Sequence, residues 1–333
     1  MFLKCFKKIK TKAIFSLLSL FIMPTSLLAY SEYVIPGGEN IGIELNSKGV
    51  MIVGLYEIGS NNPGSDAFLK VGDIILKVND KGITNIDELV AAINNKCTNI
   101  KLTYLRNNDV KTTNLKLYKD KNGVCKTGLY VKDKISGIGT LTFIDPKTKN
   151  FGALGHEIIE KSTGEILEIK DGKIYSSKVT SIDRSENGSP GEKNAEFNSD
   201  DIKGTIYENT HQGIFGKYVD ALPNKDKIKI AKPSEIKPGK ATIMTVLNNN
   251  EIKEYEIEIL RVNNNMDNNN KNILFQITDQ KLLDKTGGII QGMSGSPILQ
   301  NGKLIAAVTH VVVDDPKKGY GIFITNMLEE AEK

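Results

Sequence analysis

A serine in a Gly-x-Ser-Gly sequence is the residue of this chain best suited to chemistry. Ser294 stands in the stretch GGIIQGMSGSPIL, residues 287–299. A serine hydroxyl is a poor nucleophile at neutral pH, so acyl transfer needs a base for its proton and fixed donors for the oxyanion. Gly292 and Gly295 allow a sharp turn that presents Ser294, with the N–H groups of Gly292 and Ser294 as the expected oxyanion hole. Ser296 is a competing nucleophile, and a glycine-rich turn without a catalytic role is the alternative interpretation.

The base of such a site must be a histidine, and the chain has three. His156 lies in NFGALGHEII, His211 lies in ENTHQGIFG, and His310 lies within the apolar run AAVTHVVV. A histidine inside a β run is usually a hydrogen-bonded core residue, which disfavours His310. We prefer His156, because it precedes Ser294 in the order His then Ser of chymotrypsin-like barrels, with one catalytic group from each half.

The acid that would orient the histidine cannot be chosen from pattern alone. No metal site is expected, because HEIIE at 156–160 lacks the second histidine of a His-Glu-x-x-His motif and no cysteine cluster supports the scattered histidines. No cofactor is expected either. The candidate acids are Asp145, Asp171, Asp183, Asp220, Asp279 and Asp284.

Residues 1–30 predict a signal peptide or an N-terminal membrane anchor. Five lysines and no acid occur in the first twelve residues, and the apolar run AIFSLLSLFIMPTSLLA follows. This run is shorter than the roughly 20 residues of a spanning helix, and both removal and retention of the segment stay open. The net charge of +4 rests on these lysines, so the remainder gives no argument for nucleic acid. In an exported protein Cys97 and Cys125 either form a disulfide or stay as two thiols.

The remaining sequence predicts a mainly β protein of two domains. Residues 31–118 form a small α+β module, with an amphipathic helix that starts after Asn85 and is capped by Asn85 and Glu88. The polar stretch 119–128 is the expected linker, and residues 129–333 repeat hairpin patterns that favour a β-barrel or a pair of barrels. Hairpin turns are expected at Asp171–Gly172, Asn248–Asn250 and Asn301–Gly302.

The small module resembles the PDZ domains that are fused to bacterial envelope proteases. The resemblance lies in LKVGDIILKVND and in the order of the elements around it. In that family a glycine-containing loop before a strand binds the C-terminal carboxylate of a peptide, which adds a strand to the sheet edge. The matching stretch is GGENIGIEL, so the resemblance implies Asn40, Ile41, Gly42 and Ile43 as peptide-binding residues. An ordinary glycine turn into a strand is the alternative.

The second domain resembles chymotrypsin-like serine proteases at QGMSGSP, where Met293 replaces the usual aspartate. The longer run TDQKLLDKTGGIIQGMSGSPILQNGKLIAAVTHVVVDDPKKGYGI, with FGALGH upstream, resembles the SpoIVB peptidase family of endospore-forming bacteria. The resemblance covers essentially the whole chain and implies a chymotrypsin-like double β-barrel. It also implies Ser294 as the nucleophile, His156 as the base and Asp279 as the acid, with Asp284 as the alternative acid.

The resemblance implies a sporulation serine endopeptidase that is exported into the space between the forespore and mother-cell membranes. Such a peptidase cleaves itself and a membrane-bound regulator, and the second cleavage triggers intramembrane processing of a late sigma factor. The expected partners are a peptide or protein substrate, the protein itself, and the membrane through the N-terminal segment. The alternative function is an exported PDZ scaffold without activity that binds peptide C-termini, in which Ser294 is structural.

Overall fold

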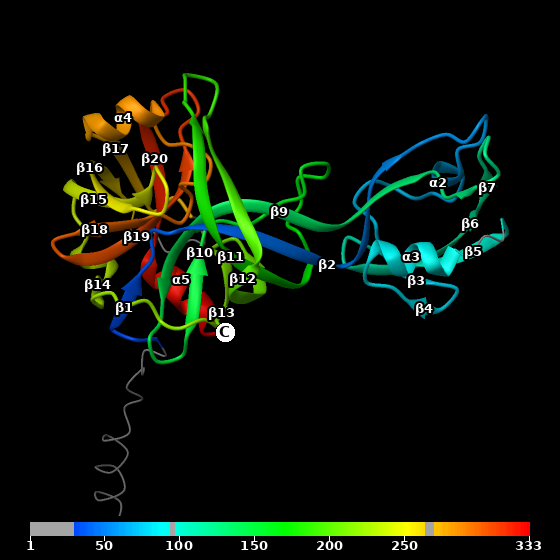
Figure 1. Ribbon diagram of the computed structural model, residues 1–333, viewed down its shortest axis with the longest axis horizontal. Coiled ribbons are helices and arrows are strands. Elements are labelled where there is room, and N and C mark those ends of the chain that lie inside the picture. Colours follow the sequence, from blue (N-terminus) through cyan, green and yellow to red (C-terminus); the bar gives the residue numbers. More distant parts are fainter. Residues whose placement is uncertain (1–29, 94–96, 264–269) are drawn as a thin grey trace, which may run out of the picture. The chain divides into compact units, whose positions relative to one another are not determined.

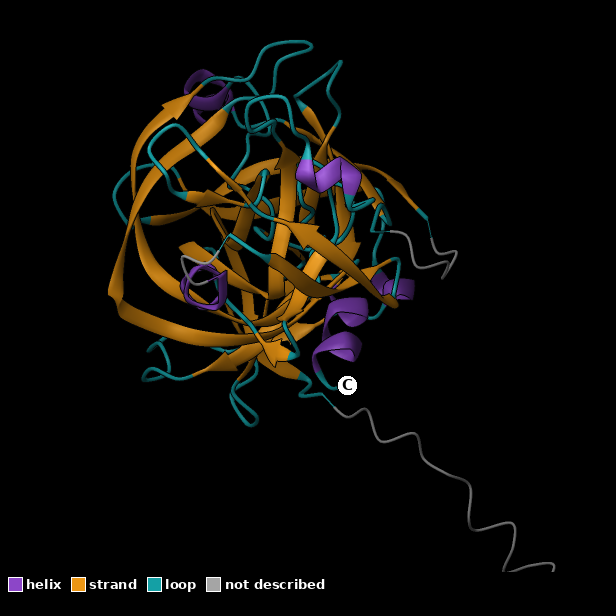
Figure 2. Cartoon of the chain, turned by 90° about the vertical axis from the view of Figure 1, so that its right-hand side faces the viewer, coloured by secondary structure: helices purple, strands orange, loops and turns teal. Residues whose placement is uncertain are grey.

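The computed structural model describes residues 30–93, 97–263 and 270–333 (Figure 1). Every element named below lies in residues 31–333, which form one compact unit. The predicted signal or anchor lies, except for Tyr30, outside the described residues. Strands predominate over a few short helices (Figure 2), which confirms the prediction of a mainly β protein. Within the described ranges, no helix has the length and apolar character that a membrane crossing requires.

The first barrel consists of six strands, which are β2 (Asn40–Leu55), β9 (Leu129–Ile144), β10 (Asn150–Ala153), β11 (Ile169–Asp183), β12 (Glu192–Thr210) and β13 (Gly213–Tyr218). They pair antiparallel in the order β9, β2, β11, β12, β13 and β10, and β10 pairs with β9 again, which closes the ring. Alternate side chains point inward, and Leu45, Phe151 and Ile174 are fully buried in its apolar core.

The second barrel also consists of six strands, which are β15 (Gly239–Val246), β16 (Ile252–Val262), β17 (Ile273–Ile277), β18 (Pro297–Gln300), β19 (Lys303–Val311) and β20 (Lys318–Phe323). The antiparallel ring runs β15, β16, β17, β20, β19 and β18, and β18 pairs with β15. Ile243, Phe275 and Ile298 are fully buried at its centre. The predicted turns at Asn248–Asn250 and Asn301–Gly302 join neighbouring strands of this ring and are confirmed.

Short elements connect the two barrels and cover their ends. The strand β1 (Tyr33–Pro36) pairs with the end of β9 and with β14 (Ile228–Ile230), which lies parallel to β19. A 3-10 turn, η1 (Pro233–Glu235), follows β14, while α4 (Gln280–Thr286) precedes the Ser294 loop and α5 (Ile324–Ala331) ends the chain. Two closed six-stranded rings are the architecture expected of a chymotrypsin-like double barrel.

The small α+β module has its own apolar core, which includes Ile52, Ile75, Leu102 and Leu115. Asn85 accepts the N–H of Glu88 and starts the predicted helix, while Glu88 accepts the N–H of Thr84. The elements are the second half of β2, α2 (Pro63–Asp66), β3 (Ile74–Val78), β4 (Lys81–Gly82), α3 (Ile86–Ile93), β5 (Asn99–Arg106), β6 (Asp109–Lys116), β7 (Tyr118–Lys119), β8 (Cys125–Lys126) and the start of β9.

The boundaries of this module differ from the predicted ones, because the module is inserted into the first barrel. The strand β1 and the first half of β2 pair with β9 and β11 of that barrel, so residues 31–47 do not belong to the small module. The predicted linker 119–128 carries β8, which pairs with β7, and Cys125 forms a disulfide with Cys97. Local patterns identified these strands but did not indicate which sheet each strand joins.

The predicted hairpin at Asp171–Gly172 is wrong. Both residues lie inside the continuous strand β11, where they pair with Asn46 and Leu45 of β2. An Asp-Gly pair favours a turn only when no longer ladder holds the chain extended, and here β2 and β12 pair with β11 on its two sides.

Candidate active site

The Ser294 loop is a tight turn between α4 and β18. Gly292 and Gly295 have φ angles of 88° and 91°, a left-handed conformation that only glycine adopts without strain. A Cβ atom on Gly295 would overlap the carbonyl oxygen of Thr140 and the backbone nitrogen of Leu154. The two glycines therefore have the conformational role that the sequence predicted.

The first barrel fixes this loop through hydrogen bonds from β9. The N–H of Thr140 donates to the carbonyl of Ser294 at 3.0 Å, and its hydroxyl donates to the carbonyl of Gly292 at 2.7 Å. The Thr142 hydroxyl donates to the carbonyl of Gly295 at 2.8 Å. Both threonines are fully buried, so the Ser294 loop of the second barrel is held on the wall of the first.

Two N–H groups of the loop are available to a developing oxyanion. The N–H groups of Met293, Gly295 and Ser296 donate to the carbonyls of Ile290, Val308 and Met293. Among the described residues, by contrast, no acceptor pairs with the N–H groups of Gly292 and Ser294, the two that the sequence predicted as the oxyanion hole. Each of these N–H groups shares a peptide plane with the carbonyl of the preceding residue. The Gln291 carbonyl accepts the N–H of Lys193 at 3.0 Å and the Met293 carbonyl accepts the N–H of Ser296 at 2.9 Å, which fixes both planes.

The two serines of the loop have different environments. The Ser294 hydroxyl donates to the carbonyl of Thr309 at 2.9 Å, and its side chain lines an open cleft. Ser296 is fully buried, and its hydroxyl has no hydrogen-bond partner within the described residues. Accessibility therefore favours Ser294 over Ser296 as the nucleophile.

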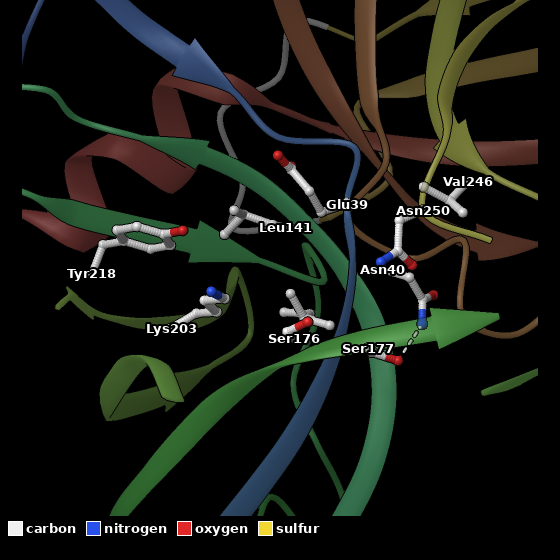
Figure 3. A pocket seen from close by; sticks show the side chains of 10 residues that line it. Glu39, Asn40, Leu141, Ser176, Ser177, Lys203, Tyr218, Val246 and Asn250 are labelled. Carbon is white, nitrogen blue, oxygen red and sulfur yellow. Dashed lines mark hydrogen bonds between the residues drawn. The ribbon is translucent and has the colours of Figure 1, made fainter. Parts of the chain in front are cut away.

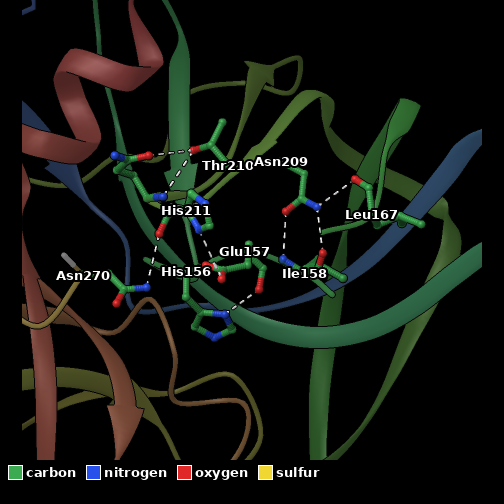
Figure 4. A network of polar contacts seen from close by, with 9 residues as sticks. His156, Glu157, Ile158, Leu167, Asn209, Thr210, His211 and Asn270 are labelled. Atoms are coloured by element: carbon green, nitrogen blue, oxygen red, sulfur yellow. Dashed lines mark hydrogen bonds and ion pairs between the residues drawn. The ribbon is translucent and has the colours of Figure 1, made fainter. Parts of the chain in front are cut away.

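His156 follows β10 of the first barrel and lines the same cleft as Ser294. Its Nδ1 lies 2.7 Å from the backbone oxygen of Glu157 (Figure 4). A carbonyl oxygen only accepts, so Nδ1 carries the hydrogen and Nε2 is the free basic nitrogen. Burial lowers the pKa of His156, and the Glu157 carbonyl and carboxylate oppose that shift. His156 is thus neutral at physiological pH, as a general base must be.

The predicted pair of His156 with Asp279 is not formed in the structure. Asp279 is the N-cap of α4, where its Oδ1 accepts the N–H of Leu282 at 3.0 Å and its Oδ2 faces the N–H of Glu256 at 3.5 Å. The alternative acid, Asp284, lies on α4 and accepts from Gln280. Capping explains an aspartate before a helix, so this part of the family pattern did not locate a partner for the histidine.

The structure gathers all three histidines around Glu157. The His156 and His310 rings lie 5.1 Å apart between centroids, and Nδ1 of His211 lies 3.3 Å from Oε1 of Glu157. Burial, and then the proximity of His156, lowers the pKa of His310 to about 4, and its buried Nδ1 has no partner within the described residues. His310 is therefore a neutral neighbour of the site and not an ordinary hydrogen-bonded core residue. No group of His, Cys, Asp and Glu able to hold a metal ion occurs in the described part of the chain.

The cleft between these groups has a volume of about 560 Å³. One wall is the strand β9 from Lys132 to Ile138, and the opposite wall is the segment 156–161. The floor at one end is the loop that carries Gly292 and Ser294. Below Gly292 lies Lys193 of β12, whose pKa burial lowers to about 7 and whose Nζ donates to Thr245. Sequence reasoning missed Lys193, because a lone lysine in a polar strand carries no signal of burial.

Residues 40–43 do not form the predicted peptide-binding edge, and that prediction is corrected here. They lie in the first half of β2, which pairs with β9 on one side and with β11 on the other. Ile41 and Ile43 are buried in the core of the first barrel, and the side chain of Asn40 donates to Ser177 of β11 at 2.9 Å (Figure 3). A strand with both edges occupied has no backbone groups for a peptide.

A groove of about 300 Å³ lies instead between α3 and the start of β9. Leu89, Val90 and Ile93 line it from the helix, and Leu129 and Val131 line it from the strand. At its end Gly128 has a φ of 71°, and its buried N–H has no acceptor within the described residues. The sequence signal is TGLYV at 127–131, a glycine followed by apolar residues. It spans the predicted boundary between the linker 119–128 and the second domain.

Two closed barrels that each contribute one candidate catalytic residue, with a helix-and-strand groove on an inserted module, define a two-barrel serine peptidase with a PDZ domain. The model of the family SpoIVB peptidase S55 matches residues 123–328, and that of the PDZ domain matches residues 40–117. The first match covers more than half of the chain, which therefore belongs to the SpoIVB peptidase S55 family. The predicted class, a serine endopeptidase acting on peptides or proteins, is confirmed.

Solved structures show weaker similarity. The inactive form of the Rv3671c protease of M. tuberculosis is 12% identical, with 58% of this chain and 82% of that chain covered and a TM-score of 0.34. The active form is also 12% identical, with 59% of this chain and 73% of that chain covered and a TM-score of 0.31. The PDZ domain of the SdrC-like protein Lmo2051 of Listeria monocytogenes is 22% identical, with 25% and 87% covered and a TM-score of 0.22. No curated protein sequence matches the chain.

Proposed function

We propose that Ser294 is the nucleophile of this peptidase and His156 its general base. The observation that carries the proposal is the Ser294 loop itself, which is fixed on the wall of the first barrel and lines the cleft of His156. Two of its N–H groups have no acceptor among the residues that the structure describes. In the reaction, Nε2 of His156 accepts the hydroxyl proton as Ser294 attacks the scissile carbonyl, and the proton then passes to the leaving amine. The N–H groups of Gly292 and Ser294 hold the oxyanion.

The Glu157 carbonyl replaces the orienting acid in this account. It accepts the Nδ1 hydrogen of His156, fixes the ring and leaves Nε2 toward the cleft. A neutral carbonyl stabilises an imidazolium less than a carboxylate does, and the Glu157 carboxylate adds charge that raises the pKa of His156. In a Ser-His-Asp triad one aspartate both orients the histidine and stabilises its charged form. Here the Glu157 carbonyl would orient the ring, and the Glu157 carboxylate would stabilise the charge.

The biological setting that we propose follows from the family and the N-terminal sequence. The peptidase is exported during sporulation into the space between forespore and mother-cell membranes, with residues 1–30 as signal or tether. There it cleaves itself and a membrane-bound regulator of the intramembrane protease that processes a late sigma factor. Support comes from the family match and from the lysine-rich, apolar start of the chain.

Hydrolysis of denatured β-casein by the full-length protein tests the assignment. Ser294→Ala should lower the rate by about a thousandfold or more, because it removes the covalent step. Ser199→Ala is the matched control, since Ser199 is exposed on β12 and does not line the cleft. It should keep a rate near that of the unaltered protein. Equal rates for the Ser294→Ala variant and the unaltered protein would contradict the proposal and favour the PDZ scaffold without activity.

In sporulating cells, the N-termini of the protein and the fragments of membrane proteins test the setting. The unaltered protein should shorten with time, whereas the Ser294→Ala variant should stay full-length and leave a membrane-bound regulator uncut. Identical fragment patterns in the two strains would overturn the proposed role.

A further inference from the structure

One strand, β9, connects the PDZ groove with the catalytic cleft. Its residues 129–131 form one wall of the groove, and its residues 132–138 form one wall of the cleft. On one edge β9 pairs with β2 from Leu129 to Thr140. On the other edge, within the described residues, no strand pairs with residues 130–138. An open edge of a β-strand is a template for an added strand, and this edge extends past both sites. The ladder that β9 forms with β2 on its other edge shifts register between Tyr130 and Val131 and between Lys132 and Lys134.

The direction of an added peptide follows from where its C-terminus would lie. The buried N–H of Gly128, which has no acceptor within the described residues, lies between Thr127 and Leu129, and both of these residues line the groove. A carboxylate placed there makes the peptide antiparallel to β9, so its preceding residues lie along Val131, Lys132 and onward. Asp133 accepts the N–H of Ile86 at 2.7 Å, which holds the N-terminus of α3 beside the exit of the groove.

The catalytic loop stands at the other end of this edge. The N–H of Thr140 donates to the Ser294 carbonyl, and a Cβ on Gly292 would lie 3.3 Å from the side chain of Ile138. A peptide that runs antiparallel to β9, with its C-terminal carboxylate at Gly128, therefore extends back to Ser294. Its scissile bond lies at Ser294. The residues after the scissile bond would lie on the β9 edge.

We infer that the enzyme selects the peptide bond to hydrolyse by its distance from the free C-terminus of the substrate. This inference rests on the function proposed above. The carboxylate binds at Gly128, the following segment adds a strand to β9, and the bond at Ser294 is hydrolysed. From Leu129 to the level of Ser294 the strand advances by about ten residues, or about 33 Å at 3.3 Å per residue. The enzyme therefore removes a C-terminal segment of about ten residues, and its substrates are proteins or peptides with a free, extended C-terminus.

Peptide libraries of increasing length test this distance rule. Each library has randomised interior residues and a C-terminal valine with a free carboxylate, and a second set ends in an amide. The full-length protein should release C-terminal fragments of about ten residues from every length of the acid libraries, as read by mass spectrometry. The amide libraries should lose this preferred length, and their cutting rate should fall by about tenfold, the factor of one lost charged hydrogen bond.

Two matched variants distinguish an effect of the groove from a general effect of a new surface charge. Val90 of α3 lines the groove and is 64% exposed, whereas Val110 of β6 is 65% exposed and does not line it. Val90→Glu should abolish the preferred fragment length, because a carboxylate in the groove repels the substrate C-terminus. Val110→Glu should leave the fragments unchanged.

Two failures have different meanings. Cuts that follow local sequence at any distance from the C-terminus, equally in acids and amides, overturn the distance rule and leave the peptidase function intact. If neither β-casein nor any library peptide is cut, the proposed peptidase function fails, and the distance rule fails with it.

Discussion

The rings of His156 in the first barrel and His310 in the second lie 5.1 Å apart between centroids. Their environments nevertheless favour different roles. His156 has its Nδ1 hydrogen held by a backbone carbonyl, so Nε2 is free to accept a proton. His310 has no partner for its buried Nδ1 within the described residues, and its pKa falls to about 4. Proximity to the nucleophile alone does not identify a base, because a fixed tautomer and an accessible basic nitrogen are also required.

The largest expected effect concerns the choice between these histidines. His156→Ala should lower kcat/KM for a casein-derived peptide by about a hundredfold or more, because the reaction loses its general base. His310→Ala should stay within about tenfold, because His310 only packs beside the base. Initial rates of the two variants at pH 8 decide which histidine is the base. A larger loss in His310→Ala than in His156→Ala would make His310 the base.

The next effect concerns the Ser294 loop, which hydrogen bonds hold on the wall of the first barrel. In Gly295→Ala, the new Cβ would overlap the carbonyl oxygen of Thr140 and the backbone nitrogen of Leu154. The φ angle of 91° would also be strained for alanine. The free energy of unfolding should fall by about 2–4 kcal/mol, and activity should fall with it. Gly82→Ala is the control, since a Cβ there meets nothing within 4 Å. Equal denaturation midpoints for the two variants would show that the loop is not held as described.

The smallest effect is a shift of the pH profile. The rate rises with pH through the pKa of His156, because only the neutral ring accepts the Ser294 proton. The Glu157 carboxylate raises that pKa, so Glu157→Gln should lower it and move the acidic limb of kcat/KM to lower pH, by about half a unit. Glu192→Gln, in the same cleft, should leave the limb in place. A shift to higher pH, or the same shift in both variants, would show that Glu157 does not act on His156.

Local sequence was sufficient where the chemistry is local. Gly292 and Gly295 were predicted to make the turn at Ser294, and both have left-handed conformations that glycine alone tolerates. Turns such as Asn301–Gly302 were predicted for the same reason, since an αL position next to a short loop depends on few neighbours. The expectation of a mainly β, two-barrel fold followed from many such hairpins in succession.

Non-local pairing is what the sequence did not reveal. Residues 37–45 and 127–131 both contain a glycine before apolar strand residues. Only tertiary structure shows that β11 closes the first edge while the second stays open. The meeting of His156, His211 and His310 depends on three separate loops and strands. Asp279 was implied by resemblance alone, and in the structure its side chain caps α4.

Identification of the residue that forms a covalent adduct tests the central claim most directly. The full-length protein is treated with a serine-directed phosphonate, digested, and mapped by mass spectrometry, with His156→Ala and His310→Ala beside it. The account predicts an adduct on Ser294 that is retained in His310→Ala and strongly reduced in His156→Ala. An adduct on Ser296, or no adduct on any serine of the unaltered protein, would contradict it.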